Sequence, residues 1–220
     1  MRIGPWMLVS GGLLVALTMG ACAGPGLTQG SGHVRSESRT VQGFDQVVLT
    51  GSGELTITQG GAESLTIEAE DNILPLLRSD VSGGRLTLGG KDNAGFSATQ
   101  PIRYKLAVKD LRAVSVSGSG DATAAQLKTD RFTVDISGSG SLSVAGSADL
   151  QKVTISGSGA YNAPDFATKE TQITISGSGH AVVKASDRLD ATVSGSGEAL
   201  YVGAPQVTSH VSGSGSVRQR

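Results

Sequence analysis

The sequence is poor in aromatic residues and has no basic run, the features on which most binding sites for sugars and nucleic acids depend. Aromatic residues make up 4% of the 220 residues, and the single tryptophan, Trp6, lies near the N-terminus. Few aromatic platforms remain on which a sugar could stack. The formal net charge is -1, and no basic run with interleaved aromatic residues occurs. The composition therefore does not predict a nucleic-acid-binding protein.

Cysteine and histidine are equally scarce. Cys22 is the only cysteine, so an internal disulfide is excluded. The three histidines, His33, His180 and His210, are scattered along the chain and support neither a metal site nor a Ser/His/Asp constellation. We expect no catalytic residues, no metal and no cofactor.

The first 22 residues have the layout of an export signal. Arg2 is followed by an apolar run over 8–19 and by the small residues Gly20 and Ala21, directly before Cys22. These last positions resemble a bacterial lipobox, with Met19 where leucine is usual. The resemblance implies a signal peptide over 1–21 and a lipid on Cys22 that anchors the protein to a membrane. The alternative is a buried apolar helix with a chance cysteine.

The resemblance to lipoproteins also implies a location. The residue after Cys22 is Ala23, not aspartate, which in Gram-negative lipoproteins favours the outer membrane. Residues 22–43 are polar and rich in Gly and Ser, with no apolar period. We expect this segment to be a flexible tether.

The four-residue motif SGSG repeats at regular intervals through the rest of the chain. It begins at Ser117, Ser137, Ser156, Ser176, Ser194 and Ser212, in steps of 20, 19, 20, 18 and 18 residues, and a TGSG variant begins at Thr50. Apolar residues alternate on both sides of each copy, which indicates strands with one inward face. A repeat of this length indicates stacked supersecondary units.

These features predict an all-β fold, a parallel β-solenoid (β-helix) over 44–217. At about 3.3 Å per residue, a repeat of 18–20 residues suits one narrow coil and is too short for a strand with a crossover helix. We expect right-handed coils. The pattern over 44–116 predicts less regular coils. Residues 70–81, which include Pro75, predict a short helical or bulged excursion from the coil, and this excursion covers an end of the stack.

The solenoid explains the glycines. Successive corners stack closely, and tight bends require a positive φ, so glycine fits where a side chain would collide. The predicted structural-turn residues are the two glycines of each SGSG: Gly118, Gly120, Gly138, Gly140, Gly157, Gly159, Gly177, Gly179, Gly195, Gly197, Gly213 and Gly215.

Two functional interpretations of the repeat are weak. Calcium-binding Gly-rich repeats need a recurring aspartate, but the residue after SGSG varies here. Asp110, Asp130, Asp149 and Asp187 fall near one bend of the coil and predict an acidic row. Aspartate favours bends because it bonds to nearby backbone, so we favour this structural role over catalysis.

A family resemblance follows from particular segments. The runs "FDQVVLTGSGELTI" and "EAEDNILPLL", the SGSG ladder and the ending "LDATVSGSGEALYVGAPQVTSHVSGSGSV" resemble the putative auto-transporter adhesin head GIN domain family. The resemblance covers roughly residues 43–217. It implies a β-helical domain of the cell envelope, and it brings no catalytic residues to this chain.

Together these features predict a non-enzymatic cell-envelope lipoprotein whose solenoid is a scaffold or an adhesion surface. Its membrane contact is the lipid on Cys22, and its ligand could be a glycan or a protein. Two alternatives stay open: a carbohydrate-binding or polysaccharide-degrading β-helix, and a ligand-sensing or partner-binding module of the envelope.

Overall fold

The computed structural model describes residues 27–220, so the predicted signal peptide and Cys22 lie outside the described residues. The elements are β1 (Thr28–Gln29), β2 (Val34–Arg39), β3 (Gln46–Gly51), β4 (Glu54–Gln59), β5 (Ser64–Glu70), the 3-10 helix η1 (Leu74–Leu76), β6 (Leu77–Ser82), β7 (Arg85–Gly90), β8 (Phe96–Ser97), β9 (Arg103–Val108), β10 (Ala113–Gly118), β11 (Asp121–Gly138), β12 (Ser141–Gly157), β13 (Ala160–Gly177), β14 (His180–Gly195), β15 (Glu198–Val202), β16 (Gln206–Gly213) and β17 (Ser216–Gln219). Among these residues no helix has the length and hydropathy needed to cross a membrane.

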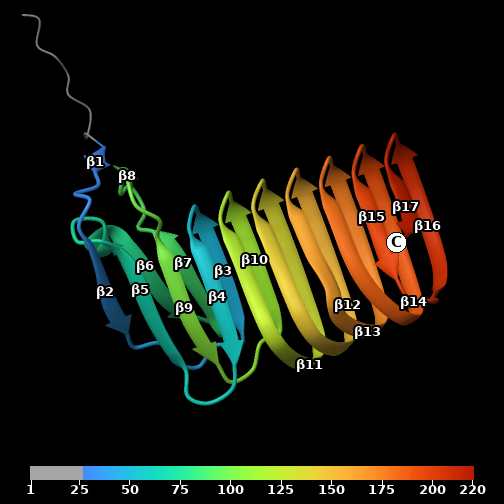
Figure 1. The fold of residues 1–220 in the computed structure, drawn as a ribbon, viewed down its shortest axis with the longest axis horizontal. Coiled ribbons are helices and arrows are strands. Elements are labelled where there is room, and N and C mark those ends of the chain that lie inside the picture. The colour runs from blue at the N-terminus through green and yellow to red at the C-terminus, as the bar shows by residue number, and fades with distance from the viewer. Residues whose placement is uncertain (1–26) are drawn as a thin grey trace, which may run out of the picture.

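The predicted β-solenoid is confirmed. Strands β10, β11, β12, β13, β14 and β16 pair in parallel, one after another, and each pair joins equivalent residues of successive repeats. Ser137, for example, pairs with Ser117 on one side and with Ser156 on the other. The coils therefore stack along one axis with the 18–20-residue repeat of the sequence, as Figure 1 shows.

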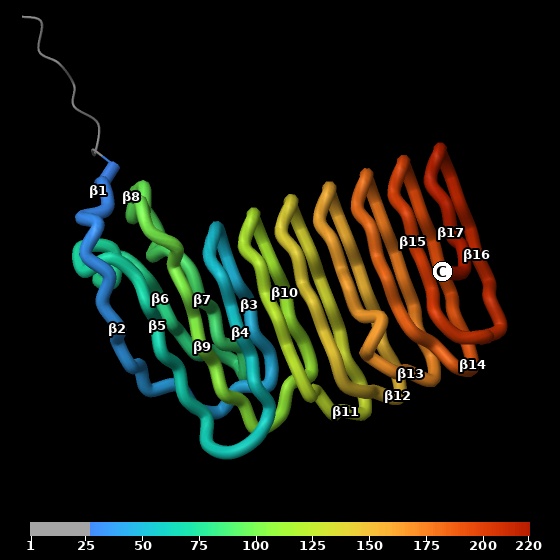
Figure 2. The backbone as a smooth tube through the Cα atoms, viewed as in Figure 1, coloured from blue at the N-terminus to red at the C-terminus, as the bar shows by residue number. Residues whose placement is uncertain are grey.

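Each coil is a narrow loop with two arms. In Figure 2 the chain turns sharply at the upper rim and bends again at the lower edge. The two arms of a coil enclose the core, because the alternating apolar side chains before and after each SGSG are buried. One internal ladder of such residues consists of Leu49, Val116, Ile136, Ile155, Ile175 and Val193.

The SGSG corners form the upper rim, and their two glycines meet different constraints. Gly157 has a φ of +118°, and a Cβ there would lie 2.7 Å from the carbonyl oxygen of Gly138 in the preceding coil. The second glycine of a corner turns inward: a Cβ on Gly179 would lie 2.5 Å from Cγ2 of Ile155. The first position thus requires a left-handed backbone and close stacking, and the second requires space beside the core.

The N-terminal coils do not follow chain order. The coils over 44–116 are less regular, as the sequence predicts: β3 lies between β7 and β10, and β4 lies between β9 and β11. The coil that contains TGSG is inserted into the stack ahead of β10, because a parallel ladder needs matching corners and inward faces but not neighbouring sequence.

The N-terminal end of the stack is closed by antiparallel strands. Strand β6 pairs antiparallel with β7, and β5 pairs antiparallel with both β9 and β2. The expected excursion within 70–81 is helix η1 followed by β6, and Ile73, Leu74 and Leu77 are buried there. These elements lie together at the end of the molecule opposite the C-terminus in Figure 1.

The structure differs from the flexible tether predicted for 22–43. Residues 34–39 form β2, and Val41 is buried in the core. The prediction was wrong for this part because β2 is an edge strand with exposed side chains on both faces. It therefore shows no apolar alternation in the sequence, and its order comes from pairing with β5.

A buried carboxylate binds the segment before β2 to the rest of the domain. Glu70 accepts hydrogen bonds from the backbone N–H groups of Gly32 (2.7 Å) and Thr99 (2.9 Å) and from the hydroxyl of Thr99. The hydrogen bond from that hydroxyl is the main reason that the pKa of Glu70 lies below its ordinary value, although burial opposes it. Next to it, the hydroxyl of Ser31 donates to Asp71.

The hydrogen bonds from Gly32 and Thr99 to Glu70, here called the Glu70 clasp, should weaken in acid. Because the pKa of Glu70 is lowered by folding, its contribution to stability is complete above the ordinary carboxyl pKa of 4.5 and is lost as the pH falls through the folded-state value. Glu70→Gln should melt below the parent at neutral pH, and the difference should shrink at about pH 3. Thermal melts at both pH values check this; an equal difference at both would contradict it.

The C-terminal end of the stack is open. Within residues 27–220, β16 pairs only with β14 and β17 pairs only with β15. Val207 and Val211, which occupy inward positions of β16, are 37% and 40% exposed. The two ends of the solenoid are therefore different surfaces, one closed by antiparallel strands and one with free strand edges.

Candidate functional site: a groove along the bend

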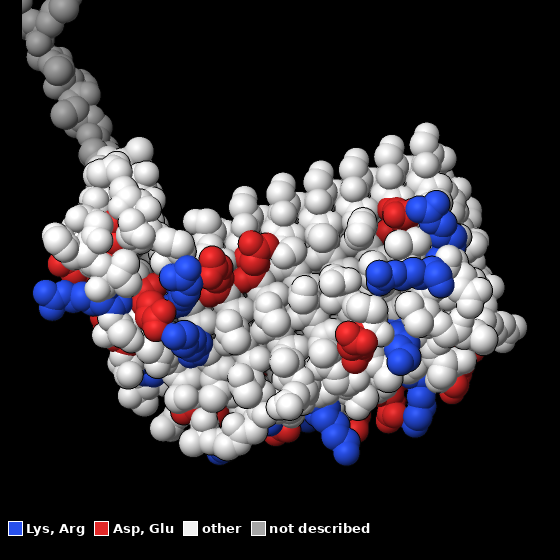
Figure 3. All heavy atoms as spheres, viewed as in Figure 1, with Lys and Arg blue, Asp and Glu red and all other residues white. Residues whose placement is uncertain are grey.

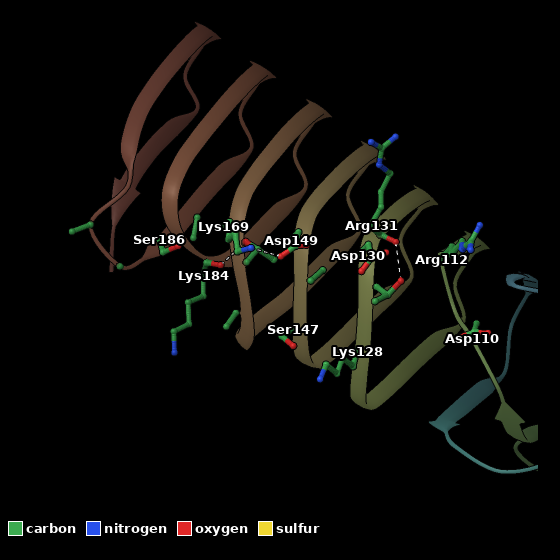
Figure 4. Close-up of a pocket in the computed structure, with 17 residues that line it drawn as sticks. Asp110, Arg112, Lys128, Asp130, Arg131, Ser147, Asp149, Lys169, Lys184 and Ser186 are labelled. Atoms are coloured by element: carbon green, nitrogen blue, oxygen red, sulfur yellow. Dashed lines mark hydrogen bonds and ion pairs between the residues drawn. The ribbon is translucent and has the colours of Figure 1, made fainter.

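A groove of about 1200 Å³ runs along the lower edge of the solenoid. It crosses six successive levels of the stack at the same place in each coil, from Asp110 and Arg112 to Gly203 and Ala204 (Figure 4). Register shifts within β11–β14 bulge the strands close to this bend. Such irregularities turn a strand and alter the direction of its side chains.

Three rows of residues make the groove. The floor row consists of Thr129, Ala148, Thr168 and Ala185, which are aligned across the coils. The residues before them form the lysine row, Lys128, Ser147, Ala167 and Lys184. The residues after them form the aspartate row, Asp130, Asp149, Lys169 and Ser186. Because the floor side chains are small, a trough remains between the longer side chains on either side, as Figure 4 shows.

The groove carries charges of both signs. In the aspartate row, Lys169 Nζ lies 2.7 Å from Asp149 Oδ1. The hydrogen bond and the charge of Asp149 raise the pKa of Lys169. Figure 3 shows acidic and basic side chains along the lower edge of the stack, whereas the upper rim of corners is free of them in this view. The bend, and not the corner, is the charged edge of the solenoid.

A buried polar network lies behind the floor row. The hydroxyl of Thr168 donates to the carbonyl oxygen of Lys184 (2.8 Å) and lies 2.6 Å from that of Thr171. Thr171 in turn donates to the side-chain oxygen of Gln151 (3.4 Å), and the Gln151 amide donates to the hydroxyl of Tyr161. Burial raises the pKa of Tyr161 far above its ordinary value, so this hydroxyl stays neutral. The network couples the floor of the groove to the core.

The structure places the predicted residues as follows. Asp110, Asp130 and Asp149 line the groove, and Asp187 follows the groove residue Ser186, whose hydroxyl donates to it (2.6 Å). The corner glycines lie on the opposite edge. Within residues 27–220 no group of three His, Cys, Asp or Glu side chains is placed to hold a metal ion.

Sequence reasoning placed Asp110, Asp130 and Asp149 near the bend, but it missed the groove and it missed that Lys169 and Ser186, not Asp187, continue the row. The sequence did contain a signal for the groove. Each aspartate-row position follows a small residue, and Lys128 and Lys184 stand two positions before Asp130 and Ser186 at equivalent places in their repeats. Only the aligned coils show that these positions form continuous rows.

One further polar group is buried at the N-terminal end. The hydroxyl of Tyr104 has no hydrogen-bond partner among residues 27–220, and burial raises the pKa of Tyr104 to about 12. Tyr104 is fully buried in β9, away from the groove. It is part of the core below the N-terminal strands.

The fold and this site define a β-solenoid domain that presents a long polar groove on one edge. The family model for the putative auto-transporter adhesin head GIN domain matches residues 43–205. The chain belongs to this family, as the sequence resemblance predicted. No curated protein sequence matches the chain significantly.

Solved structures share the fold. A putative adhesin from Bacteroides fragilis has a TM-score of 0.71 at 20% identity, covering 87% of this chain and 99% of its own. A putative adhesin from Parabacteroides merdae has a TM-score of 0.57 at 22% identity, covering 88% and 98%. A protein from Parabacteroides distasonis described as a putative lipid binding protein has a TM-score of 0.56 at 22% identity, covering 89% and 100%. These likenesses support the fold.

Proposed function

We propose that this chain is a non-enzymatic, lipid-anchored binding protein of the cell envelope, whose solenoid displays the groove as an adhesion surface. The observation that carries the proposal is the groove itself, which is open along six levels and continuous across the repeats. A repeating edge of this kind suits an extended partner, because each coil adds side chains at the same place along the groove.

The alternative of a polysaccharide-degrading enzyme has less support. Glycoside hydrolysis requires two carboxyl groups in separate roles, usually in environments that separate their pKa values. In the groove Asp149 is paired with Lys169, and both side chains are more than half exposed to solvent. An exposed ion pair of this kind is not the enclosed carboxyl group that serves as the acid in such enzymes.

Binding arrays test the proposal. The chain without residues 1–21 and with Cys22→Ala would be applied to glycans, host and bacterial surface proteins, and phospholipid vesicles, the last because one structural neighbour is described as lipid binding. Specific, saturable binding to at least one class is the expected result. Turnover of a polysaccharide, or the absence of binding to every class, would contradict the proposal.

The membrane anchor has its own test. Because Cys22 is the only cysteine and follows the small residues Gly20 and Ala21, Cys22→Ala should abolish fatty-acid labelling and leave an unlipidated precursor. Palmitate labelling of intact bacteria, followed by fractionation of inner and outer membranes, checks both the lipid and the location. Equal labelling of parent and variant would rule out the anchor. Ser10→Ala in the apolar run serves as the matched control and should label normally.

A further inference from the structure

We propose that the groove binds an acidic polysaccharide lengthwise, with the lysine row contacting its carboxylate or sulfate groups. This inference rests on the proposed function and names its ligand class. The groove crosses six levels of the stack, and levels of parallel strands are about 4.8 Å apart, so the groove extends for roughly 24 Å. A groove of this length fits several units of a linear polymer.

The charges of the groove favour an anionic ligand. Its lining holds five basic residues, Arg112, Lys128, Arg131, Lys169 and Lys184, against three acidic ones, Asp110, Asp130 and Asp149. The lining residues are therefore net positive, but Asp45 beside Arg112 and Asp187 beside Ser186 offset this excess at the edges of the groove. The charge that favours an anion is thus that of the basic side chains with no acidic partner.

Three of these cations, Lys128, Arg131 and Lys184, take part in no ion pair within residues 27–220, whereas Lys169 pairs with Asp149 and Arg112 with Asp45. In Figure 4 Lys128 and Lys184 point to the same side of the coils and Arg131 points to the other side, so the two lysines are the pair that one ligand can contact. Lys128 and Lys184 occupy the same row, three levels apart, so their backbones are about 14 Å from each other. A single extended polyanion that follows the row can contact both.

The surroundings of the groove disfavour a peptide as the occupant. Strands β12 and β13 are paired on both sides where they form the groove, and the backbone N–H and C=O of Lys128 in β11 are hydrogen-bonded to the side chain of Gln59, so the middle of the groove offers no free edge for an added strand. The floor row contains only alanine and threonine, which form no pocket for a large apolar side chain. The usual modes of peptide recognition, a strand on an edge or an apolar face in a groove, are therefore not supported here.

The lining also distinguishes acidic from neutral glycans. No aromatic residue is among the described residues that line the groove, so a neutral sugar finds no ring on which to stack. Hydroxyl groups are present on both sides of the floor, at Ser147 and Ser186, and on the floor itself at Thr129. A charged glycan can use these hydroxyls together with the lysines, and each hydrogen bond to a charged group is stronger than a neutral one.

The test compares two double variants of the chain without residues 1–21 that carries Cys22→Ala. Lys128→Ala/Lys184→Ala removes the two unpaired lysines of the lysine row and leaves Arg131 in place. Lys109→Ala/Lys152→Ala removes the same charge from exposed positions outside it. Truncation at Lys184 leaves its backbone carbonyl, the acceptor of Thr168, in place. Binding to polygalacturonate, alginate, dextran and polyglutamate would be measured by calorimetry at physiological salt, with circular dichroism as the check of folding.

The parent should bind polygalacturonate or alginate and not dextran. The groove variant should bind about tenfold more weakly or worse, while the control variant stays within about twofold. Equal weakening of both variants would show non-specific attraction and overturn the inference. So would absence of uronate binding, or polyglutamate binding with the same dependence on the groove lysines. The proposed function survives these outcomes if the arrays show another ligand, and it fails if they show none or if a polysaccharide is turned over.

Discussion

Gly157→Val should destabilise the protein more than any exposed substitution in the chain. Gly157 has a φ of +118°, in a region that side-chain-bearing residues rarely adopt, and a Cβ would lie 2.7 Å from the carbonyl oxygen of Gly138. Backbone strain of roughly 1–3 kcal/mol and overpacking of a similar size should add to about 4 kcal/mol. For a domain of this size, the corresponding fall in Tm is roughly 10 °C. Denaturant and thermal melts measure the effect.

The matched control for this variant is Gly61→Val. Gly61 also has a positive φ, +76°, but a Cβ there meets nothing within 4 Å, so the variant should show strain alone, roughly 1–2 kcal/mol. Gly32 has a similar φ, +79°, and also has nothing within 4 Å of a Cβ. It is less suitable as a control because its N–H donates to Glu70. If Gly157→Val melts like Gly61→Val, the close stacking of the corners does not contribute to stability.

The second large effect is expected in the buried polar network. Gln151→Leu removes the amide that donates to the hydroxyl of Tyr161 and the oxygen that accepts from Thr171. Both Gln151 and Tyr161 are fully buried, so their partners have no water to replace the lost hydrogen bonds. The loss of stability should be about 2–4 kcal/mol, since each abandoned polar group costs its desolvation.

A double-mutant cycle separates this cost from simple repacking. Tyr161→Phe alone should destabilise by roughly 1–2 kcal/mol because it leaves the Gln151 amide without an acceptor. The double variant Gln151→Leu/Tyr161→Phe removes both the amide and the hydroxyl, so neither is left buried without its partner. The stability losses of the two single variants should therefore add up to more than the loss measured for the double variant. Strict additivity in urea melts would mean that the two side chains are not coupled.

The regular half of the fold was predictable from the sequence because each coil repeats the same local pattern of apolar residues and glycines. The apolar alternation around SGSG specifies which side chains point inward, and the paired glycines mark where only a residue without a side chain can be stacked. The positions of Ile136, Ile155 and Ile175 in one internal ladder follow directly from their equal distance to the corner. The family resemblance followed from the same residues.

The order of the N-terminal coils could not be predicted in this way. Periodicity shows that Leu49 and Val116 occupy equivalent positions, but it does not show that they are neighbours across 67 residues of chain. Strand β2 likewise has no periodic pattern, and its order depends on hydrogen bonds to β5 and on the contacts of Glu70 with Gly32 and Thr99. These are long-range pairings, which local sequence does not encode.

By itself, the sequence determined the solenoid repeat, the inward ladders, the corner glycines and the position of Asp110, Asp130 and Asp149 near the bend, because all of these depend on spacing within one coil. The tertiary structure alone decided the insertion of β3 and β4 ahead of β10, the clasp around Glu70 and the groove. The physical reason is that a groove arises between rows, and a row exists only when equivalent residues such as Lys128 and Ser147 are brought into register by stacking.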